Sequence, residues 1–592
     1  MSTVTAEFVP QAEPANHSEL SSLVDVLRRR AAEQPDDPAY IFLPERGGER
    51  LSLTFAELYA SAEALAINLG ERAQIGDRAL LLFSPGLDFI VAFFACLLAG
   101  VIAVPMMVPR RASSSDASAA ILADCSPRFA LTRSDLLTIA RPDLRERFQA
   151  SRLDWVFVDS CAAASIKERD PLPVPGRDDI AFLQYTSGST SAPKGVVVKH
   201  GNLVENSEMI RIAFGNTRKS THVSWVPLYH DMGLILNALQ SLYVGALCVI
   251  MAPVGFMQRP LSWLRAIHDY RAEVAGGPNF AFDLCVRRYR SEELQGVDLS
   301  CWKVAINGAE PVRANTIDRF TATFAPHGFD SKSLQPAYGM AEATLLISAN
   351  RRGTGPTSRK VDRDALQRNR IITPARERDS QILVGCGRQL TGEQLAIVDP
   401  ETRTLLGPGL VGEVWVGGPH IAEGYWRKPE VTSAVLRAQL ASGGDQYWLR
   451  TGDLGFVDEG GELYITGRIK DLIIIRGINH YPQDIEETVQ NCHVALRRHG
   501  GVVFSVPDQE DEEQLVVVQE IERTFRRGVT RDELVASIRE AIAKEHELTA
   551  GEIVLIRTGS LPKTTSGKLQ RQLTRQMFRT GALSPLSAAI VL

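Results

Sequence analysis

The chain has 592 residues, and its 65 Lys and Arg against 70 Asp and Glu leave a formal net charge of −5. This balance argues against a dedicated nucleic-acid binder, because such proteins are usually basic. Gly and Pro, at 46 and 31 residues, stay far below the share of about 25–30% that marks low-complexity chains. At roughly 150 residues per domain, the length predicts about four structural units. The eight cysteines form no C-x-x-C pair, so neither a zinc knuckle nor a dithiol redox site is predicted.

The first 20 residues are polar, and we expect them to be loosely ordered. Residues 1–10 contain no basic region followed by an apolar run, which is the pattern of a secretory signal. Together with the scattered cysteines, this predicts a cytoplasmic protein.

Residues 89–109 form a run of 21 residues without a charged side chain, which is long enough for a transmembrane helix. Gly100 and Pro105 divide the run, however, and both residue types interrupt helices. We therefore expect a buried helix over residues 89–99 that ends at Gly100, then a short buried strand over residues 101–104, and no membrane span.

Short β-rich runs alternate with helical patterns through the first part of the chain. These runs lie at residues 78–83, 153–158, 180–184, 246–251 and 302–306. Such alternation predicts parallel sheets covered by helices. Strands crowd together from about Leu395, which indicates a small β-rich subdomain, and after Gly467 short strands mix with helices. The predicted fold class is α/β, with an N-terminal body of layered subdomains over residues 21–467 and an α+β C-terminal domain over residues 468–592.

Two segments are basic although the protein is acidic. Residues 350–380 hold nine Lys and Arg and four Asp and Glu, and residues 557–579 hold six Lys and Arg and no acid. A run of charge is usually a solvated surface. A surface insertion is therefore the simplest interpretation of residues 350–380.

A loop rich in glycine and hydroxyl side chains follows the predicted strand at residues 180–184. Residues 185–196, YTSGSTSAPKGV, hold two glycines, five Ser or Thr and Lys194. Glycine lets backbone N–H groups approach phosphate oxygens, hydroxyls add donors, and a lysine adds charge. Lys194 is followed by Gly195, so this is not a Walker A loop. The segment predicts a phosphate-binding loop, with an ordinary Ser/Gly surface loop as the alternative.

Eight further motifs follow this loop along the chain. They are WVPLYHDMG (225–233), GGPNFAFD (276–283), NGAEPVR (307–313), YGMAEAT (338–344), GEVWVGGP (412–419), YWLRTGD (447–453), GRIKD (467–471) and LPKTTSGK (561–568). Together with the loop they resemble the adenylate-forming superfamily of acyl-CoA synthetases, firefly luciferases and peptide-synthetase adenylation domains. The resemblance spans residues 51–575. It implies that ATP and Mg²⁺ are the cofactors and that the C-terminal domain is a mobile lid.

The resemblance also implies a nucleotide site. The implied phosphate-binding residues are Thr186, Ser187, Gly188, Ser189, Thr190 and Lys194. The implied residues around adenine and ribose are Gly308, Ala309, Glu310, Tyr338, Gly339, Met340, Ala341, Asp453, Ile465 and Arg468. Of these, Tyr338 would stack on the adenine, and Asp453 would accept hydrogen bonds from the ribose hydroxyls. Thr186 and Glu342 would hold Mg²⁺.

The same resemblance implies that Lys568 reaches from the C-terminal domain to the substrate carboxylate and the α-phosphate. Lys470 or Asp471 would be the hinge of that domain. A carboxylic acid with a pKa of about 4 is ionised at pH 7, so its attack on phosphorus needs no general base. The site must instead bring two anions together, and a lysine in a Gly/Ser/Thr loop fits that need. Without the motif order, a surface lysine would be the simpler interpretation of Lys568.

An acyl pocket is implied as well. Its residues would be Trp225, Met232, Gly276, Gly277, Pro278 and Phe280, although ordinary core packing would look the same. His230 would be a further catalytic residue on the path of the acyl group, with a hydrogen-bonded core histidine as the alternative. Amino-acid adenylation domains hold the substrate ammonium with an Asp in a Phe-Asp-x-Ser context. Asp231 stands in a different frame, so the sequence does not support an α-amino substrate.

Within the superfamily, five features resemble the fatty acyl-AMP ligase branch. Four are the stretches GVIAVP (100–105), ILADCSPRFALT (121–132), WVPLYHDMGLI (225–235) and GPNFAFDLC (277–285). The fifth is the long interval between Thr344 and Gly385, where residues 350–380 match an insertion that is thought to restrain the C-terminal domain and disfavour CoA. One departure is the segment Met-Met-Val-Pro-Arg-Arg after Pro105, where the branch has an aromatic residue and more prolines.

Three hypotheses follow. The first is a fatty acyl-AMP ligase that forms acyl-adenylate, releases pyrophosphate and loads the phosphopantetheine thiol of a holo-acyl carrier protein of a polyketide or peptide synthase. The second is a medium- or long-chain acyl-CoA ligase that keeps the insertion. The third is an inactive acyl-adenylate-binding or scaffold protein, against which the intact Lys568 argues. Because carrier proteins are usually acidic, the basic residues 557–579, with Arg571 and Arg575, are a candidate carrier contact.

Overall fold

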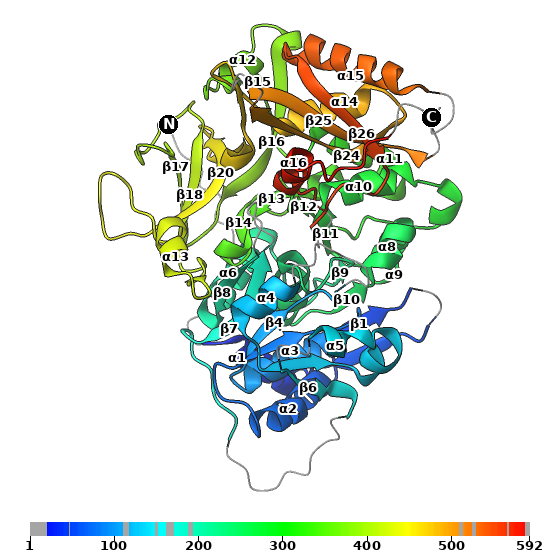
Figure 1. Ribbon diagram of the computed structural model, residues 1–592. Helices are drawn as coiled ribbons and strands as arrows, with labels where there is room; N and C mark the ends of the chain where they lie inside the picture. The colour runs from blue at the N-terminus through cyan, green and yellow to red at the C-terminus, as the bar shows by residue number, and fades with distance from the viewer. Residues whose placement is uncertain are drawn as a thin grey trace, which may run out of the picture.

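The computed structural model describes residues 20–586, apart from residues 46–47, 110–117, 149–151, 161–170, 187–192, 508–512, 524–528 and 565–567. Two large sheets, two small sheets and the helices around them form the molecule (Figure 1). The predicted α/β class is confirmed.

A seven-stranded sheet lies in the lower part of the molecule in the view of Figure 1, in the order β19-β8-β7-β4-β3-β5-β6. Its strands are β3 (Arg78–Leu81), β4 (Ile102–Pro105), β5 (Phe129–Thr132), β6 (Asp154–Phe157), β7 (Ile180–Thr186), β8 (Lys194–Lys199) and β19 (Gly424–Tyr425). Strands β3 to β7 are parallel neighbours, whereas β8 runs antiparallel to β7. The end of the predicted phosphate loop at Lys194 is therefore already strand.

The uncharged run forms α3 (Asp88–Leu98) and then β4, with Gly100 between them at a φ of +66°. Phe93 and Phe94 are fully buried, and Phe93 packs edge-on against Phe182 of β7. The prediction of a core helix followed by a buried strand is confirmed. Within the described residues, no helix is long and apolar enough to cross a membrane.

The second large sheet contains fourteen strands, in the order β17-β18-β20-β21-β16-β14-β13-β12-β11-β9-β10-β1-β2, with β15 beside β16. From β1 to β12 its strands are β1 (Pro38–Leu43), β2 (Leu51–Thr54), β9 (His222–Ser224), β10 (Cys248–Met251), β11 (Val274–Pro278) and β12 (Val304–Gly308). From β13 onward they are β13 (Leu334–Gly339), β14 (Leu346–Ala349), β15 (Ser358–Asp362), β16 (Ser380–Gln389), β17 (Gln394–Val398), β18 (Gly412–Gly417), β20 (Leu449–Val457) and β21 (Glu462–Arg468).

The parallel neighbours β11, β12 and β13 end at Pro278, Gly308 and Gly339. The three motifs that contain these residues therefore lie at one edge of the sheet. In open α/β sheets, ligands bind outside the carboxyl ends of the strands. The sheet order thus gathers at one place motifs that the sequence separates.

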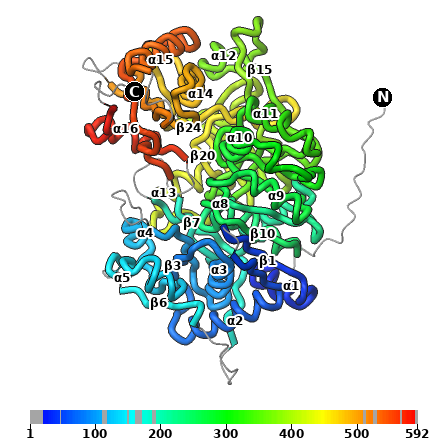
Figure 2. The backbone as a smooth tube through the Cα atoms, turned by 90° about the vertical axis from the view of Figure 1, so that its right-hand side faces the viewer, coloured from blue at the N-terminus to red at the C-terminus, as the bar shows by residue number. Residues whose placement is uncertain are grey.

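Helices cover both large sheets (Figures 1 and 2). Those of the N-terminal body besides α3 are α1 (Leu23–Glu33), α2 (Phe55–Gly70), α4 (Ser118–Cys125), α5 (Asp143–Arg147), α6 (His200–Phe214), α7 (Gln240–Val244), α8 (Pro253–Gln258), α9 (Leu261–Asp269), α10 (Asn279–Arg287), α11 (Ala314–Phe324), α12 (Arg363–Gln367), α13 (Pro429–Val435) and the π-helix η5 (Met232–Leu239). α2 begins at a capping box, in which Thr54 and Glu57 each bond the other's backbone N–H, as such Thr-x-x-Glu sequences do.

The C-terminal part has its own small sheet, β24 (Leu496–Pro507), β25 (Glu513–Ile521) and β26 (Ala550–Arg557). The helices α14 (Pro482–Cys492), α15 (Arg531–His546) and α16 (Arg571–Arg579) accompany it, with the hairpin β22 (Ile473–Ile475) and β23 (Ile478–His480). A separate buried cluster holds this part together, with Ile485, Val517 and Ile538 at its centre. This arrangement matches the predicted α+β style.

The basic insertion, residues 350–380, is more than a solvated loop. It forms β15, which pairs with β16, and α12, and Val361 lies in one buried cluster with Tyr481 of the C-terminal part. The Arg363 guanidinium donates a 2.7 Å hydrogen bond to the carbonyl of Glu545 on α15. Both views place β15 and α12 beside α14 and α15 (Figures 1 and 2). The segment is thus a surface insertion that also packs on the C-terminal part.

Candidate functional site

A cavity of about 2770 Å³ lies between the N-terminal body and the C-terminal part. The predicted nucleotide, catalytic and hinge residues that line it are Thr186, Lys194, His230, Gly308, Ala309, Glu310, Tyr338, Gly339, Met340, Ala341, Glu342, Asp453, Ile465, Arg468, Lys470, Asp471 and Lys568. Ser187, Gly188, Ser189 and Thr190 lie outside the described residues. One cavity thus collects residues from all nine motifs, because Phe280 and Glu413, from the remaining two, line it as well.

Asp453 is held at the centre of a polar cluster on one wall of the cavity. Its carboxylate is almost fully buried and accepts 2.7 Å from the Tyr338 hydroxyl and 2.8 Å from Nε of Arg468. The register of β20 against β21 sets Asp453 opposite Arg468, so the pair follows from the sheet. The nearby Asp453 carboxylate raises the pKa of Arg468 above its ordinary value.

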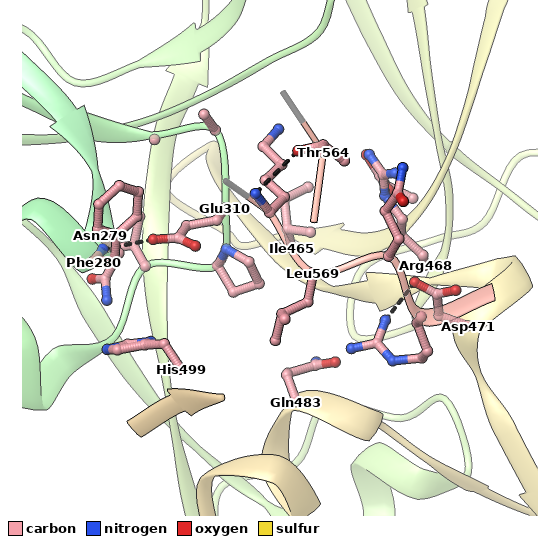
Figure 3. Close-up of a pocket in the computed structure, with 18 of the residues that line it drawn as sticks. Asn279, Phe280, Glu310, Ile465, Arg468, Asp471, Gln483, His499, Thr564 and Leu569 are labelled. Atoms are coloured by element: carbon pink, nitrogen blue, oxygen red, sulfur yellow. Dashed lines mark hydrogen bonds and ion pairs between the residues drawn. The ribbon is translucent and has the colours of Figure 1, made fainter. Parts of the chain in front are cut away.

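On the opposite wall, Glu310 joins two of the motifs. Its Oε1 accepts a 2.6 Å hydrogen bond from the backbone N–H of Phe280, at the start of α10. Ala309 just before it has a φ of +65°, a left-handed conformation that is uncommon for residues other than glycine. Figure 3 shows Glu310 and Phe280 on one side of the cavity, Arg468 on the other, and Thr564 between them.

Glu342 is a buried carboxylate that acts electrostatically on Lys194, at the end of the phosphate loop. Burial raises its pKa, and the Tyr425 hydroxyl opposes this rise by donating a 2.7 Å hydrogen bond to Oε1. The ring of Tyr425 also lies 5.1 Å from Nζ of Lys194, a cation–π distance. Tyr425 was not predicted as a site residue, because it lies between two motifs and belongs to neither.

Four lysines, Lys194, Lys470, Lys563 and Lys568, bring positive charge to the cavity. Burial lowers the pKa of Lys194, and the neighbouring Lys470 lowers it further. The pKa of Lys568 is also lowered by burial, and the nearby Asp231 carboxylate offsets only part of this fall. Lysines that lack enough acidic partners to restore their ordinary pKa suit a polyanionic ligand.

Asp231 pairs with His230 and is influenced electrostatically by Lys568. Its Oδ1 is 2.7 Å from Nδ1 of His230, and it accepts 2.6 Å from the N–H of Met232. Burial alone would raise the pKa of Asp231, but His230 and Lys568 outweigh it and lower the value to about 2. In the sequence, Asp231 argued only against an amino-acid substrate, so its pairing with His230 was not predicted.

The six predicted acyl-pocket residues divide into two groups. Trp225, Met232 and Phe280 line the cavity, and Trp225 stacks on Phe256 at 3.9 Å. The other three, Gly276, Gly277 and Pro278, lie within β11 and do not line it. A Cβ on Gly277 would lie 2.9 Å from Cζ2 of Trp225, so this glycine makes room for the indole ring.

The predicted hinge lies in the short 3-10 helix η11 (Ile469–Asp471). Arg571 of α16 pairs with Asp471 at 2.6 Å and with Glu486 at 2.8 Å, and Gln572 donates to the carbonyl of Lys470 at 3.0 Å. The Arg571 side chain is only 18% exposed. The idea that Arg571 contacts a carrier protein therefore does not fit, because this guanidinium is already engaged within the chain.

Two known families match the chain: the AMP-binding enzyme family over residues 27–426, and the Disco-interacting protein 2-like AMP domain over residues 470–587. A medium-chain-fatty-acid–[acyl-carrier-protein] ligase of Moorena producens is 43% identical over 581 residues, 97% of each chain. A ligase of the same description from Teredinibacter turnerae is 38% identical over 603 residues, 94% of this chain and 93% of the relative.

A solved structure of the fatty acyl-adenylate ligase from Legionella pneumophila, in complex with acyl adenylate and pyrophosphate, is similar to this chain. It has a TM-score of 0.73 and 37% identity, and the match covers 95% of this chain and 97% of that one. The fold and the cavity are thus those of an adenylate-forming enzyme. The chain belongs to the AMP-binding enzyme family and, within it, to the fatty acyl-AMP ligases.

Proposed function

We propose that the protein activates a fatty acid with ATP to an acyl-adenylate, releases pyrophosphate, and transfers the acyl group to the phosphopantetheine thiol of an acyl carrier protein of a polyketide or peptide synthase. The observation that carries this proposal is the position of Lys568. It comes from the C-terminal part, yet it lines the same cavity as Glu310, Asp453 and Glu342. The named activity of the Moorena and Teredinibacter relatives supports the carrier protein as acceptor.

The first half-reaction joins two anions. The fatty carboxylate attacks the α-phosphorus of ATP, a bond forms from its oxygen to phosphorus, and the bond to pyrophosphate breaks. Lys568 would hold the carboxylate and the α-phosphate together, and Lys194 and Lys470 would offset the charge of the leaving pyrophosphate. Positive charge placed where negative charge gathers is the main contribution that such a site makes to the rate.

The residues of the cavity near Lys194 suit Mg²⁺. Glu342 and Thr186 offer hard oxygen ligands, which Mg²⁺ prefers, and both line the cavity near Lys194. In the part of the chain that the structure describes, no group of three or more His, Cys, Asp or Glu side chains is placed to hold a metal alone. That fits an ion that takes most of its ligands from substrate phosphates and water. When bound, it would neutralise phosphate charge.

Adenosine would bind along the edge formed by β12, β13 and β20. Tyr338 would stack on the adenine, next to Gly308, Ala309 and Glu310, and Asp453 would accept from the ribose hydroxyls. A ribose there would compete with the Tyr338 hydroxyl and Arg468 for the two Asp453 oxygens. We infer that at least one of these hydrogen bonds is exchanged when nucleotide binds.

The acyl chain would lie against Trp225, Met232 and Phe280, which give the cavity an apolar wall. His230, fixed by Asp231, would stand where the acyl carboxylate meets the phosphate site. The medium-chain acids named for two relatives are the substrate class that we propose.

We infer an N-terminal adenylation body over residues 21–467, preceded by the tail of residues 1–20, and a lid domain over residues 468–592 that turns at Lys470 or Asp471. The basic insertion, residues 350–380, would restrain this turn. The contact between Arg363 and the carbonyl of Glu545 supports such a restraint, because turning the lid would break it.

The acceptor is tested with the purified full chain, ATP, Mg²⁺ and a C8–C12 fatty acid, mixed with either CoA or a holo-acyl carrier protein. We expect rapid pyrophosphate release and acyl-carrier formation, with little acyl-CoA. Acyl-CoA formed as fast as acyl-carrier would overturn the acceptor assignment. Failure to form acyl-adenylate at all would support the inactive binding protein instead.

A further inference from the structure

The main chain of Lys568 is tied to Thr564 by a reciprocal pair of hydrogen bonds. The N–H of Thr564 donates to the carbonyl of Lys568 over 2.7 Å, and the N–H of Lys568 donates to Oγ1 of Thr564 over 3.0 Å. One step outside, the N–H of Gln570 donates to the carbonyl of Pro562 over 3.0 Å. These hydrogen bonds thus tie residues 562–564 to residues 568–570, between β26 and α16. Figure 3 shows Thr564 beside the cavity.

The base of the same segment is held by a buried carboxylate. Glu520 of β25 is fully buried and accepts hydrogen bonds from the N–H groups of Gly559 (2.8 Å) and Leu561 (2.9 Å) and from the Arg497 guanidinium (2.6 Å). Hydrogen bonds to a charged acceptor are about twice as strong as neutral ones. The start of the segment is therefore anchored independently of Thr564, which leaves the threonine to set the position of Lys568.

Lys568 lines the cavity, and charged groups of the N-terminal body act on its ammonium. Burial lowers its pKa, Asp231, Glu310 and Asp453 oppose this fall, and Arg468 adds to it. A lysine side chain has a flexible four-carbon stem, so where its ammonium lies depends on how firmly its main chain is held. In a catalytic site, a displacement of 1 Å can reduce the rate by about 10².

We propose that Thr564 positions Lys568. Its hydroxyl does so by accepting the hydrogen bond that the backbone N–H of Lys568 donates. The inference rests on the proposed function, because it needs Lys568 to act in acyl-adenylate formation. A valine at position 564 keeps the size and β-branching of threonine but removes the acceptor. A serine keeps the acceptor and loses only the methyl group.

The test compares Thr564→Val, Thr564→Ser and Lys568→Ala by pyrophosphate release from ATP and a medium-chain fatty acid, using the full chain. Thr564→Val is expected to lower kcat by roughly tenfold, a smaller loss than the roughly 10² that a full 1 Å displacement can cause. The KM values should change by less than about twofold. Thr564→Ser is expected to restore at least half of the wild-type kcat. The matched control is Thr580→Val, because Thr580 bonds only backbone carbonyls of α16 and does not line the cavity.

The outcomes separate this inference from the function it rests on. A normal rate in Lys568→Ala would overturn the role of Lys568, and with it the positioning role. An inactive Lys568→Ala beside a fully active Thr564→Val would overturn the positioning role alone. A loss in Thr564→Val that serine does not rescue, or that accompanies a fall in Tm, would show that Thr564 serves folding rather than positioning.

Discussion

The hydroxyl of Tyr425 donates a 2.7 Å hydrogen bond to the buried carboxylate of Glu342. Tyr425 lies on β19, which pairs with β8 at Val196, whereas Glu342 follows β13 of the other large sheet. The same tyrosine ring lies 5.1 Å from Nζ of Lys194. One side chain therefore links the carboxylate proposed for Mg²⁺ with the lysine proposed for the ATP phosphates.

Replacing Tyr425 with phenylalanine removes the donor that opposes the burial-induced rise in the pKa of Glu342. We expect the carboxylate to ionise less readily and kcat/KM for adenylation to fall by about tenfold, the scale of one hydrogen bond to a charged group. Pyrophosphate release measured over a series of Mg²⁺ concentrations checks this, and half-saturation should move to higher Mg²⁺. Tyr243→Phe is the control, because its hydroxyl bonds Glu208 away from the cavity. An unchanged Mg²⁺ dependence in Tyr425→Phe would contradict the prediction.

Lys568→Ala removes a cation from the point where the carboxylate and α-phosphate would meet. We expect adenylation to fall by roughly 10² or more, which is the effect of losing one key electrostatic donor. Pyrophosphate release is the measurement, and Lys544→Ala on the exposed side of α15 is the control. A rate close to wild type in Lys568→Ala would refute the assignment of this lysine.

Gly277→Ala places a methyl group 2.9 Å from Cζ2 of Trp225. Because Trp225 is stacked on Phe256 at 3.9 Å, we expect its ring to shift into the cavity and narrow the apolar wall. The expected result is a roughly tenfold lower kcat/KM for long fatty acids, on the scale of one or two methylene groups in an apolar pocket, and a smaller loss for short ones. Competition between C6 and C12 acids measures the effect. Gly70→Ala is the control, because its new Cβ meets nothing within 4 Å.

Asp484 on α14 predicts a pH-dependent stability. Burial raises its pKa to about 7, and Glu487 adds to the rise, although Gln381 of the body donates a 2.9 Å hydrogen bond that opposes it. Its unfolded pKa is about 3.9, so the folded chain holds one more proton between about pH 4 and 7. Stability therefore falls as the pH rises through this window.

Asp484→Asn cannot titrate, so its Tm should fall less than that of the wild type between about pH 5 and pH 8. Differential scanning fluorimetry in a buffer series checks this, with the exposed Asp445→Asn as the control. Parallel curves for Asp484→Asn and the wild type would show that Asp484 does not cause the dependence.

Much of the architecture could be predicted from local patterns. The uncharged run around Gly100 was correctly assigned to a helix and a buried strand, because helix breakers and apolar periodicity act over a few residues. The motif order correctly indicated the adenylate-forming enzymes, and four further stretches with the long interval before Gly385 correctly indicated the fatty acyl-AMP ligases. The predicted ATP residues that are described all line one cavity. These features depend on residues that are close together in the chain or that recur in a set order.

Pairings between distant segments were decided only by the tertiary structure. The hydrogen bond of Tyr425 with Glu342 and the electrostatic effect of Lys568 on Asp231 depend on how two sheets and two domains meet. Neither tyrosine nor aspartate carries a local signal of such a partner. For the same reason, the charge of the basic insertion by itself indicated a solvated surface, whereas the insertion packs on the C-terminal part through Val361 and Arg363. Charge along the sequence shows which residues prefer water, but the register of the sheets and the packing of the domains determine which of them find partners.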